Sequence, residues 1–154
     1  MRTLLIVVSQ YASPYIPFLK GCVNDAKEVK GFLTERLHVP DSQIMFLTNK
    51  DATRDAILTA FLQHLTTNDG IDEGDAIIFY YAGHGSRVKA PDGWPATDGM
   101  IETLCPYDNG MTDEKGEAIH GIPDRTINVM LRDLAAKKGD NIVRLTIFCL
   151  YPRH

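Results

Sequence analysis

The sequence predicts an α/β fold in which helices cover both faces of a mostly parallel sheet. Short apolar runs alternate with segments whose apolar residues recur every three or four positions, and this alternation is typical of strands separated by helices. The apolar runs are continuous, as expected for strands that are buried on both faces. In such sheets, functional residues gather at the carboxyl ends of the strands.

The composition fits one soluble domain. At 154 residues, with 44% hydrophobic and 23% charged residues, the chain can bury a core without disulfides. A net charge of -4 and scattered basic residues argue against nucleic-acid binding. Three widely spaced cysteines indicate neither a disulfide framework nor a zinc site, so we expect a reducing, cytoplasmic setting. No apolar run approaches the ~20 residues that span a membrane, and we expect no membrane partner.

The first half of the chain predicts two strands and two helices in alternation. Leu4–Val8 and Ile44–Leu47 are short apolar runs of the buried-strand kind. Between them, an amphipathic helix begins at Asn24 and stops before Pro40. A second helix follows residues 49–53, which contain Asp and Thr as candidate N-caps.

The second half predicts two more strands around a long loop. Ile77–Tyr81 is an apolar strand, and residues 87–121 are rich in Gly, Pro and Asp, with a small hairpin expected around Met100–Leu104. A helix then runs from Pro123 to Gly139, a residue type that commonly ends helices. The strand at 141–148 follows, and the sequence stops six residues later.

His84 stands between two glycines directly after the third strand. Flanking glycines leave room around an imidazole and let a substrate approach the backbone, so the Gly85 N–H is a candidate to receive an oxyanion. The alternative, a polar histidine in a flexible turn, has about equal weight from this stretch alone.

Common hydrolase motifs are missing from the sequence: there is no GxSxG elbow, P-loop, GxGxxG or HExxH. The chemistry that remains is that of a cysteine nucleophile paired with a histidine. Such a site needs a thiolate whose pKa is lowered by the nearby imidazole.

Four segments together resemble the large-subunit region of fungal metacaspases, which are caspase-like cysteine peptidases. They are LKGCVNDAKEVKGFL (19–33), IIFYYAGHGSR (77–87), DGMIETLCPYD (98–108) and IHGIPDRTIN (119–128). The resemblance covers nearly the whole chain in the family's order. It implies a caspase-like three-layer sandwich, formed by one domain over residues 1–154 that lacks the family's last strands. It also implies a cytoplasmic cysteine endopeptidase of a kind associated with programmed cell death.

The resemblance implies roles for three residues. His84 corresponds to the catalytic base, and Asp25 to an acidic wall of the pocket that accepts the Arg or Lys before the cleaved bond of a protein or peptide substrate. Cys22 lines the same pocket. A carboxylate suits a guanidinium, although an acid in the first turn of a helix is equally expected from the helix dipole. For Cys22 and Cys105, a small buried apolar role carries more weight.

The resemblance requires no cofactor for the chemistry, but some family members are activated by calcium through acids near the substrate cleft. Four acids have a similar context here: Asp98, Glu102, Asp108 and Asp124. We take Asp98 and Asp124 as the candidate calcium ligands. The alternative is a solvated acidic loop, because calcium needs several oxygens brought together.

The chain departs from the family where the nucleophile is expected. In the family, the fourth strand ends in Asp-Cys-Cys-His-Ser-Gly, whose second Cys attacks the peptide and whose Asp completes the basic-residue pocket. Here Cys149 follows Phe148, with no Asp before it and no His-Ser-Gly after it. Cys149 lies 65 residues after His84, against roughly 50 in caspases, and the long loop can absorb the difference. Cys149 is therefore the candidate nucleophile.

This departure leaves two functions open. The first is a cysteine endopeptidase of low activity, and the alternative is an inactive caspase-like interaction module or a truncated gene product. The family fold continues with further strands, so we expect the strand at 141–148 to form an apolar edge. Such an edge predicts marginal solubility or a partner that covers it.

Overall fold

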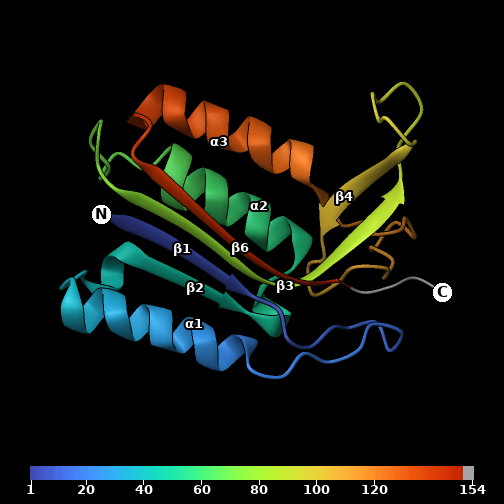
Figure 1. Cartoon of the computed structure of the whole chain (residues 1–154), viewed down its shortest axis with the longest axis horizontal. Coiled ribbons are helices and arrows are strands. Elements are labelled where there is room, and N and C mark those ends of the chain that lie inside the picture. Colours follow the sequence, from blue (N-terminus) through green and yellow to red (C-terminus); the bar gives the residue numbers. More distant parts are fainter. Residues whose placement is uncertain (151–154) are drawn as a thin grey trace.

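Six strands form one curled sheet in the computed structural model, which describes residues 1–150 and the side chains up to Phe148 (Figure 1). The strands are β1 (Arg2–Val7), β2 (Ile44–Thr48), β3 (Ile77–Lys89), β4 (Met100–Leu104), β5 (Ile122–Pro123) and β6 (Ile142–Leu150). The helices are α1 (Cys22–Gly31), α2 (Arg54–Ala60) and α3 (Asp124–Lys138). Two π-helical segments, Phe32–Arg36 and Phe61–Thr66, extend α1 and α2, and short 3-10 turns cover Asp41–Gln43 and Asn49–Asp51.

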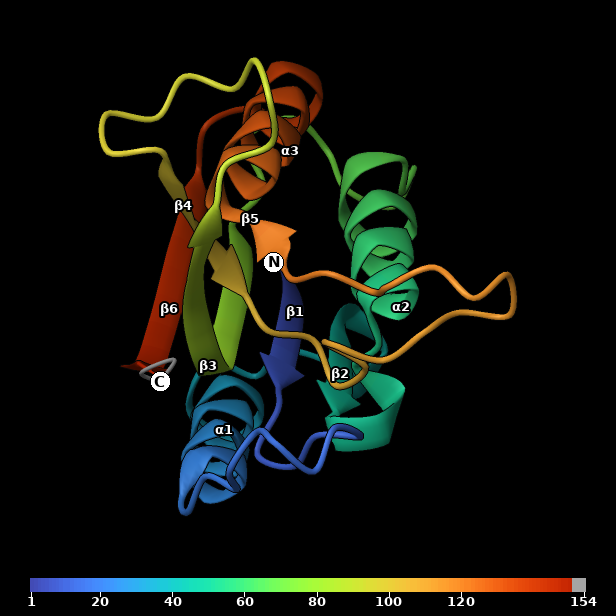
Figure 2. The ribbon, with the colours of Figure 1, turned by 90° about the vertical axis from the view of Figure 1, so that its right-hand side faces the viewer.

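The sheet has the order β2-β1-β3-β4-β5, and β6 pairs with β3 on the side opposite β1. The pairings of β1 with β2, β1 with β3 and β3 with β6 are parallel, whereas β4 is antiparallel to both β3 and β5. Helices α2 and α3 cover one face and α1 covers the other (Figure 2). The predicted three-layer α/β architecture is therefore confirmed.

Strand β1 shows how the sequence builds these layers. Leu4 and Ile6 pack in the core beneath α2 and α3, whereas Leu5 and Val7 pack in the core beneath α1. All four side chains are fully buried. A strand must be apolar at every position when successive side chains enter two different cores, which explains the continuous run in the sequence.

The three predicted helices are confirmed with small changes at their ends. Helix α1 begins at Cys22, two residues earlier than predicted. Helix α2 begins after Thr53, whose hydroxyl accepts a hydrogen bond from the Ala56 N–H at 3.3 Å. Helix α3 ends at Lys138 and is followed by Gly139, which has a φ of 84°. Within residues 1–150, every helix falls short of the length and apolar character that crossing a membrane demands.

Strand β3 is much longer than the sequence predicted. The predicted strand ends at Tyr81 and gives way to a turn, but β3 continues through His84 to Lys89. On one side, β1 pairs with β3 as far as Ala82, and β4 pairs with it from Gly85 onward. The alternative of a flexible turn at His84 is therefore wrong, because a second partner strand pairs with β3 where the first one ends.

The two glycines beside His84 provide close packing and not open space. A Cβ on Gly83 would lie 2.6 Å from the Tyr81 hydroxyl oxygen, and a Cβ on Gly85 would lie 2.9 Å from Cδ1 of Phe148. Both separations are too short for real side chains, so the neighbouring rings occupy the space that a side chain would need. The expectation of room around His84 is therefore wrong, and the imidazole is only 3% exposed.

Strand β6 forms the edge of the sheet among the described residues. It pairs with β3 in parallel over nine positions, Ile77–Gly85 with Ile142–Leu150, and no other strand within residues 1–150 pairs with it. Its side chains at Val143, Leu145 and Ile147 are 48%, 45% and 48% exposed. The predicted apolar edge is present in this part of the chain.

Two adjacent tyrosines on β3 provide a matched test of this core. Both side chains are almost fully buried. The Tyr81 hydroxyl donates to two carbonyl oxygens, that of His84 at 2.9 Å and that of Cys105 at 2.8 Å. The Tyr80 hydroxyl is buried and has no hydrogen-bond partner in the described part of the chain. The two tyrosines therefore differ in hydrogen bonding and hardly in burial.

We expect Tyr81→Phe to lower the free energy of unfolding by about 1–3 kcal/mol, because buried carbonyl oxygens lose their donor. Tyr80→Phe should change it by less than about 0.5 kcal/mol or raise it, since an unpaired buried hydroxyl is removed. Urea unfolding of both variants measures the difference. Equal destabilisation by the two substitutions would contradict this assignment.

Candidate active site

The imidazole of His84 lies at the point on β3 where the pairing strand changes from β1 to β4. Its Nε2 atom lies 2.9 Å from the carbonyl oxygen of Pro17, in the loop between β1 and α1. A carbonyl oxygen can only accept, so Nε2 carries a proton and donates it to this bond. In the neutral ring, the lone pair then resides on Nδ1, which is the nitrogen able to take a proton.

Two tyrosines hold the backbone of His84. The Tyr11 hydroxyl accepts a hydrogen bond from the His84 N–H at 2.7 Å, and its ring centroid lies 5.3 Å from that of the imidazole. The His84 carbonyl oxygen accepts from the Tyr81 hydroxyl and from the Cys105 N–H, the latter at 3.0 Å. Burial raises the pKa of both Tyr11 and Tyr81, so both phenols stay protonated and neutral.

The candidate nucleophile Cys149 occupies the position on β6 that pairs directly with His84 on β3. The pairing is parallel and continues without a break from Ile77 and Ile142. The side chain of Cys149 lies outside the described residues. At the level of the backbone, the two candidate catalytic positions are neighbours on adjacent strands.

The candidate pocket residues Cys22 and Asp25 lie in the first turn of α1. Cys22 is buried against Tyr80 and Ala82 in the core beneath this helix, and Asp25 is exposed. Burial raises the pKa of Tyr80, and the negative charge of Asp25 raises it further. The carboxylate and the Tyr80 phenol are therefore close enough to interact, four residues before the candidate base.

Gly85 lies inside the sheet, with neighbours on both sides. It pairs in register with Leu104 on β4 and with Leu150 on β6. The oxyanion role of its N–H stays a prediction.

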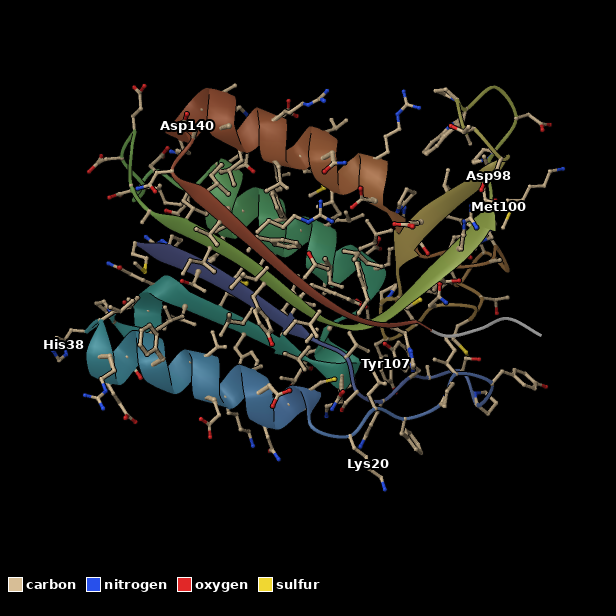
Figure 3. All side chains as sticks on the ribbon, in the orientation of Figure 1. Lys20, His38, Asp98, Met100, Tyr107 and Asp140 are labelled. Carbon is tan, nitrogen blue, oxygen red and sulfur yellow. The ribbon has the colours of Figure 1, made fainter. Side chains whose placement is uncertain are left out.

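The two candidate calcium ligands are each paired with a different arginine. Asp98 lies at the far end of the β3–β4 hairpin (Figure 3), where it forms an ion pair with Arg87 and accepts from the Met100 N–H at 3.1 Å. Asp124 begins α3 and pairs with Arg144 on β6. Within residues 1–150, no group of three or more His, Cys, Asp or Glu side chains is placed to hold a metal ion. These carboxylates do not form the oxygen cage that calcium needs, and calcium activation stays a prediction.

Sequence reasoning missed three residues of this site: Tyr11, Pro17 and Tyr81. Tyr81 was assigned only to the apolar core, since a strand pattern does not reveal where a phenol hydroxyl points. Pro17 acts through its carbonyl oxygen, which every residue type possesses. Nothing in the sequence therefore marks Pro17 as a hydrogen-bond partner of His84. Tyr11 lies in a loop 73 positions from the histidine whose backbone it holds.

Comparison with solved structures supports the fold. The chain is similar to protein GSU0716 from Geobacter sulfurreducens, with a TM-score of 0.66 and 20% sequence identity over 97% of this chain and 49% of that one. At this identity, the likeness concerns the fold alone.

Comparison with known sequences shows the family. Metacaspase-1 of Mycosarcoma maydis is 33% identical over 120 residues, which are 74% of this chain and 29% of that protein. Metacaspase-1 of Cryptococcus neoformans var. neoformans is 35% identical over 125 residues, 77% of this chain and 25% of the relative. Metacaspase-1 of Arabidopsis thaliana is 36% identical over 93 residues, 58% of this chain and 25% of the relative.

The chain thus spans between a quarter and a third of the length of these relatives. The family described as metacaspase, peptidase C14 domain, matches residues 1–146. This match includes His84 and both candidate pocket residues, Cys22 and Asp25. The chain therefore belongs to the metacaspase family of C14 cysteine peptidases.

Proposed function

We propose that the chain acts as a cysteine endopeptidase in which Cys149 is the nucleophile and His84 the base. The observation that carries this proposal is the parallel register that makes these two positions direct neighbours on β6 and β3. The hydrogen bond from Nε2 to the Pro17 carbonyl supports it further, because it orients the ring and leaves Nδ1 to exchange the proton.

In the proposed mechanism, the Cys149 thiol gives its proton to Nδ1 of His84, and the sulfur bonds to the carbonyl carbon of the scissile peptide. The proton then passes from the imidazolium to the leaving amine as the C–N bond breaks, which leaves a thioester. Water, deprotonated by His84, attacks the thioester and restores the thiol. Backbone N–H groups near Gly85 and Cys149 receive the oxyanion in both steps.

The proposed substrate class is a peptide with Arg or Lys before the cleaved bond. Asp25 supports this choice, because its carboxylate is exposed in the first turn of α1 and its charge raises the pKa of Tyr80, which lies on the same strand as the candidate base. A guanidinium or ammonium group is a suitable partner for such a carboxylate. The acid that precedes the nucleophile in the family is absent here, so basic-residue binding relies on fewer charges.

The second candidate is an inactive interaction module of the same fold. It is favoured by the residues around Cys149, which lack the family's flanking Asp and His-Ser-Gly, and by the exposed apolar side chains of β6. In this case, a partner would cover the edge strand. The two candidates differ in the reactivity of Cys149.

A peptide chloromethyl ketone ending in Arg tests the proposed nucleophile. We expect it to alkylate Cys149 in preference to Cys22 and Cys105, which are both buried. Labelling should be slow, because a 1 Å error in a reacting group costs roughly 10²-fold in rate. It should be lost in Cys149→Ala and strongly reduced in His84→Ala, and peptide mapping by mass spectrometry locates the adduct. Equal labelling of all three cysteines would instead establish the inactive module.

Asp25→Asn tests the basic-residue pocket. We expect the preference of labelling for an Arg over a norleucine chloromethyl ketone to fall roughly 10- to 100-fold, as for the loss of one charge-assisted hydrogen bond. Glu28→Gln is the matched control, since it removes an exposed acid from the same helix. The pocket assignment fails if both variants lose the preference equally or if neither does.

Tyr11→Phe tests the positioning of His84. The ring remains, but the buried His84 N–H loses its acceptor, and we expect the labelling rate of Cys149 to fall about tenfold. The pH dependence of labelling should also shift, because the imidazole moves relative to its Pro17 partner. Tyr15→Phe is the control in the same loop, where the side chain is 83% exposed. A loss of stability with an unchanged pH profile would mean that Tyr11 is merely structural.

A further inference from the structure

A cavity lies beside the β3–β4 hairpin, and Figure 2 shows the arrangement of β3, β4, β5 and α3 around which its lining residues lie. It has a volume of about 730 Å³ and is bounded by the β3–β4 hairpin, by the loop that follows β4, and by the start of α3. Apolar side chains from these segments line it, among them Val88, Trp94, Ile101 and Ile119. Its size is that of a site for a drug-sized organic molecule.

Among the described residues, the charged side chains that line this cavity are both basic: Arg54 from the start of α2 and Lys89 from the end of β3. The imidazole of His120, from the segment before β5, lines it as well. Among the described residues, no carboxylate lines it, although the whole chain carries a net charge of -4. Two cations brought together from separate elements favour an anionic ligand.

Several acidic side chains face a different, smaller cavity of about 330 Å³. Its lining includes Asp55, Asp108 and Asp113. Arg54 and His120 line both cavities and form the wall between them. The larger cavity therefore keeps a basic lining while the carboxylates lie on the other side of this wall.

A buried hydroxyl at the cavity provides a second, independent observation. Ser86 lines the cavity and is only 7% exposed, and its Oγ has no hydrogen-bond partner among the described residues. The neighbouring Thr103 hydroxyl donates to the Ser86 carbonyl oxygen at 3.3 Å and not to this Oγ. A buried hydroxyl left unpaired is costly, and a ligand oxygen in the cavity would accept from it.

One wall of the cavity is held in place by an aromatic contact. The Arg125 guanidinium carbon lies 5.5 Å from the centre of the Trp94 ring, within the range of a cation–π interaction. This contact connects the loop between β3 and β4 to helix α3. Trp94 is also the single tryptophan of the chain, so its fluorescence reports on this cavity alone.

From these observations, we infer that the cavity binds an organic anion, namely a carboxylate carried by an apolar body. The apolar body would lie against Trp94 and Ile101, and the carboxylate would face Lys89 and Arg54 and accept from Ser86. Among the side chains that the structure describes, no candidate active-site residue lines this cavity, so the inference does not depend on peptidase activity.

Titration of the 154-residue chain with 4-tert-butylbenzoate tests the inference through Trp94 emission. We expect a saturable change, and about tenfold weaker binding of 4-tert-butylbenzamide, which has nearly the same shape without the charge. Lys89→Gln should weaken benzoate binding severalfold and leave benzamide binding unchanged. Lys27→Gln, which removes an exposed cation from α1 outside the cavity, should change neither.

Several outcomes would overturn the inference. Emission that does not saturate with benzoate, or equal affinities for benzoate and benzamide, would show that the basic lining selects no anion. Equal weakening by Lys89→Gln and Lys27→Gln would show an effect of net charge and not of this cavity. Ser86→Ala tests the contribution of the hydroxyl. The variant should bind benzoate more weakly and still unfold cooperatively.

Discussion

The central constraint in this structure is the hydrogen bonding of β3 at Gly83 and His84. On one side of the strand, β1 ends beside Ala82 and β4 begins beside Gly85, so the backbone of His84 falls between two partner strands. Buried backbone groups without partners are costly. The Tyr11 hydroxyl accepts from the N–H and the Tyr81 hydroxyl donates to the carbonyl. The same contacts that keep the sheet continuous thus hold the candidate base.

Much of the fold could be predicted because local sequence patterns indicate most of its strands and helices. Continuous apolar runs gave β1, β2, β3 and β6, and helical spacing with capping residues gave the three helices. The extension of β3 to Lys89 was missed because it depends on β4, a strand distant in the sequence. Gly83 and Gly85 were expected to leave open space around His84, but the rings of Tyr81 and Phe148 pack against them. Neither tertiary effect has a signature in a single strand.

The candidate site was predictable where a side chain carries the role and not where the backbone does. His84 and Asp25 stand in recognisable motifs, whereas Pro17 contributes only its carbonyl oxygen. Asp124 has a partner that the sequence reasoning did not predict, while its role as a calcium ligand stays a prediction. An acid near a predicted cleft suggested calcium, but its carboxylate pairs with Arg144, the one charged residue within an apolar strand. A charged residue within an apolar strand needs a partner of opposite charge. Arg144 could therefore have predicted an ion pair with an acid from the sequence alone.

The ion pair between Asp124 and Arg144 also bears on the altered nucleophile region. Arg144 donates to Asn128 at 3.0 Å as well, so β6 is attached to α3 well before the strand reaches Cys149. Further along β6, the Phe148 ring packs near Tyr81, with centroids 5.9 Å apart. Because strand register is set by such contacts along the whole strand, the pairing of Cys149 with His84 does not depend on the residues that flank the cysteine in the family. The substitutions around Cys149 therefore change the surroundings of the thiol, whereas the backbone register that pairs Cys149 with His84 is supported by contacts earlier in the strand.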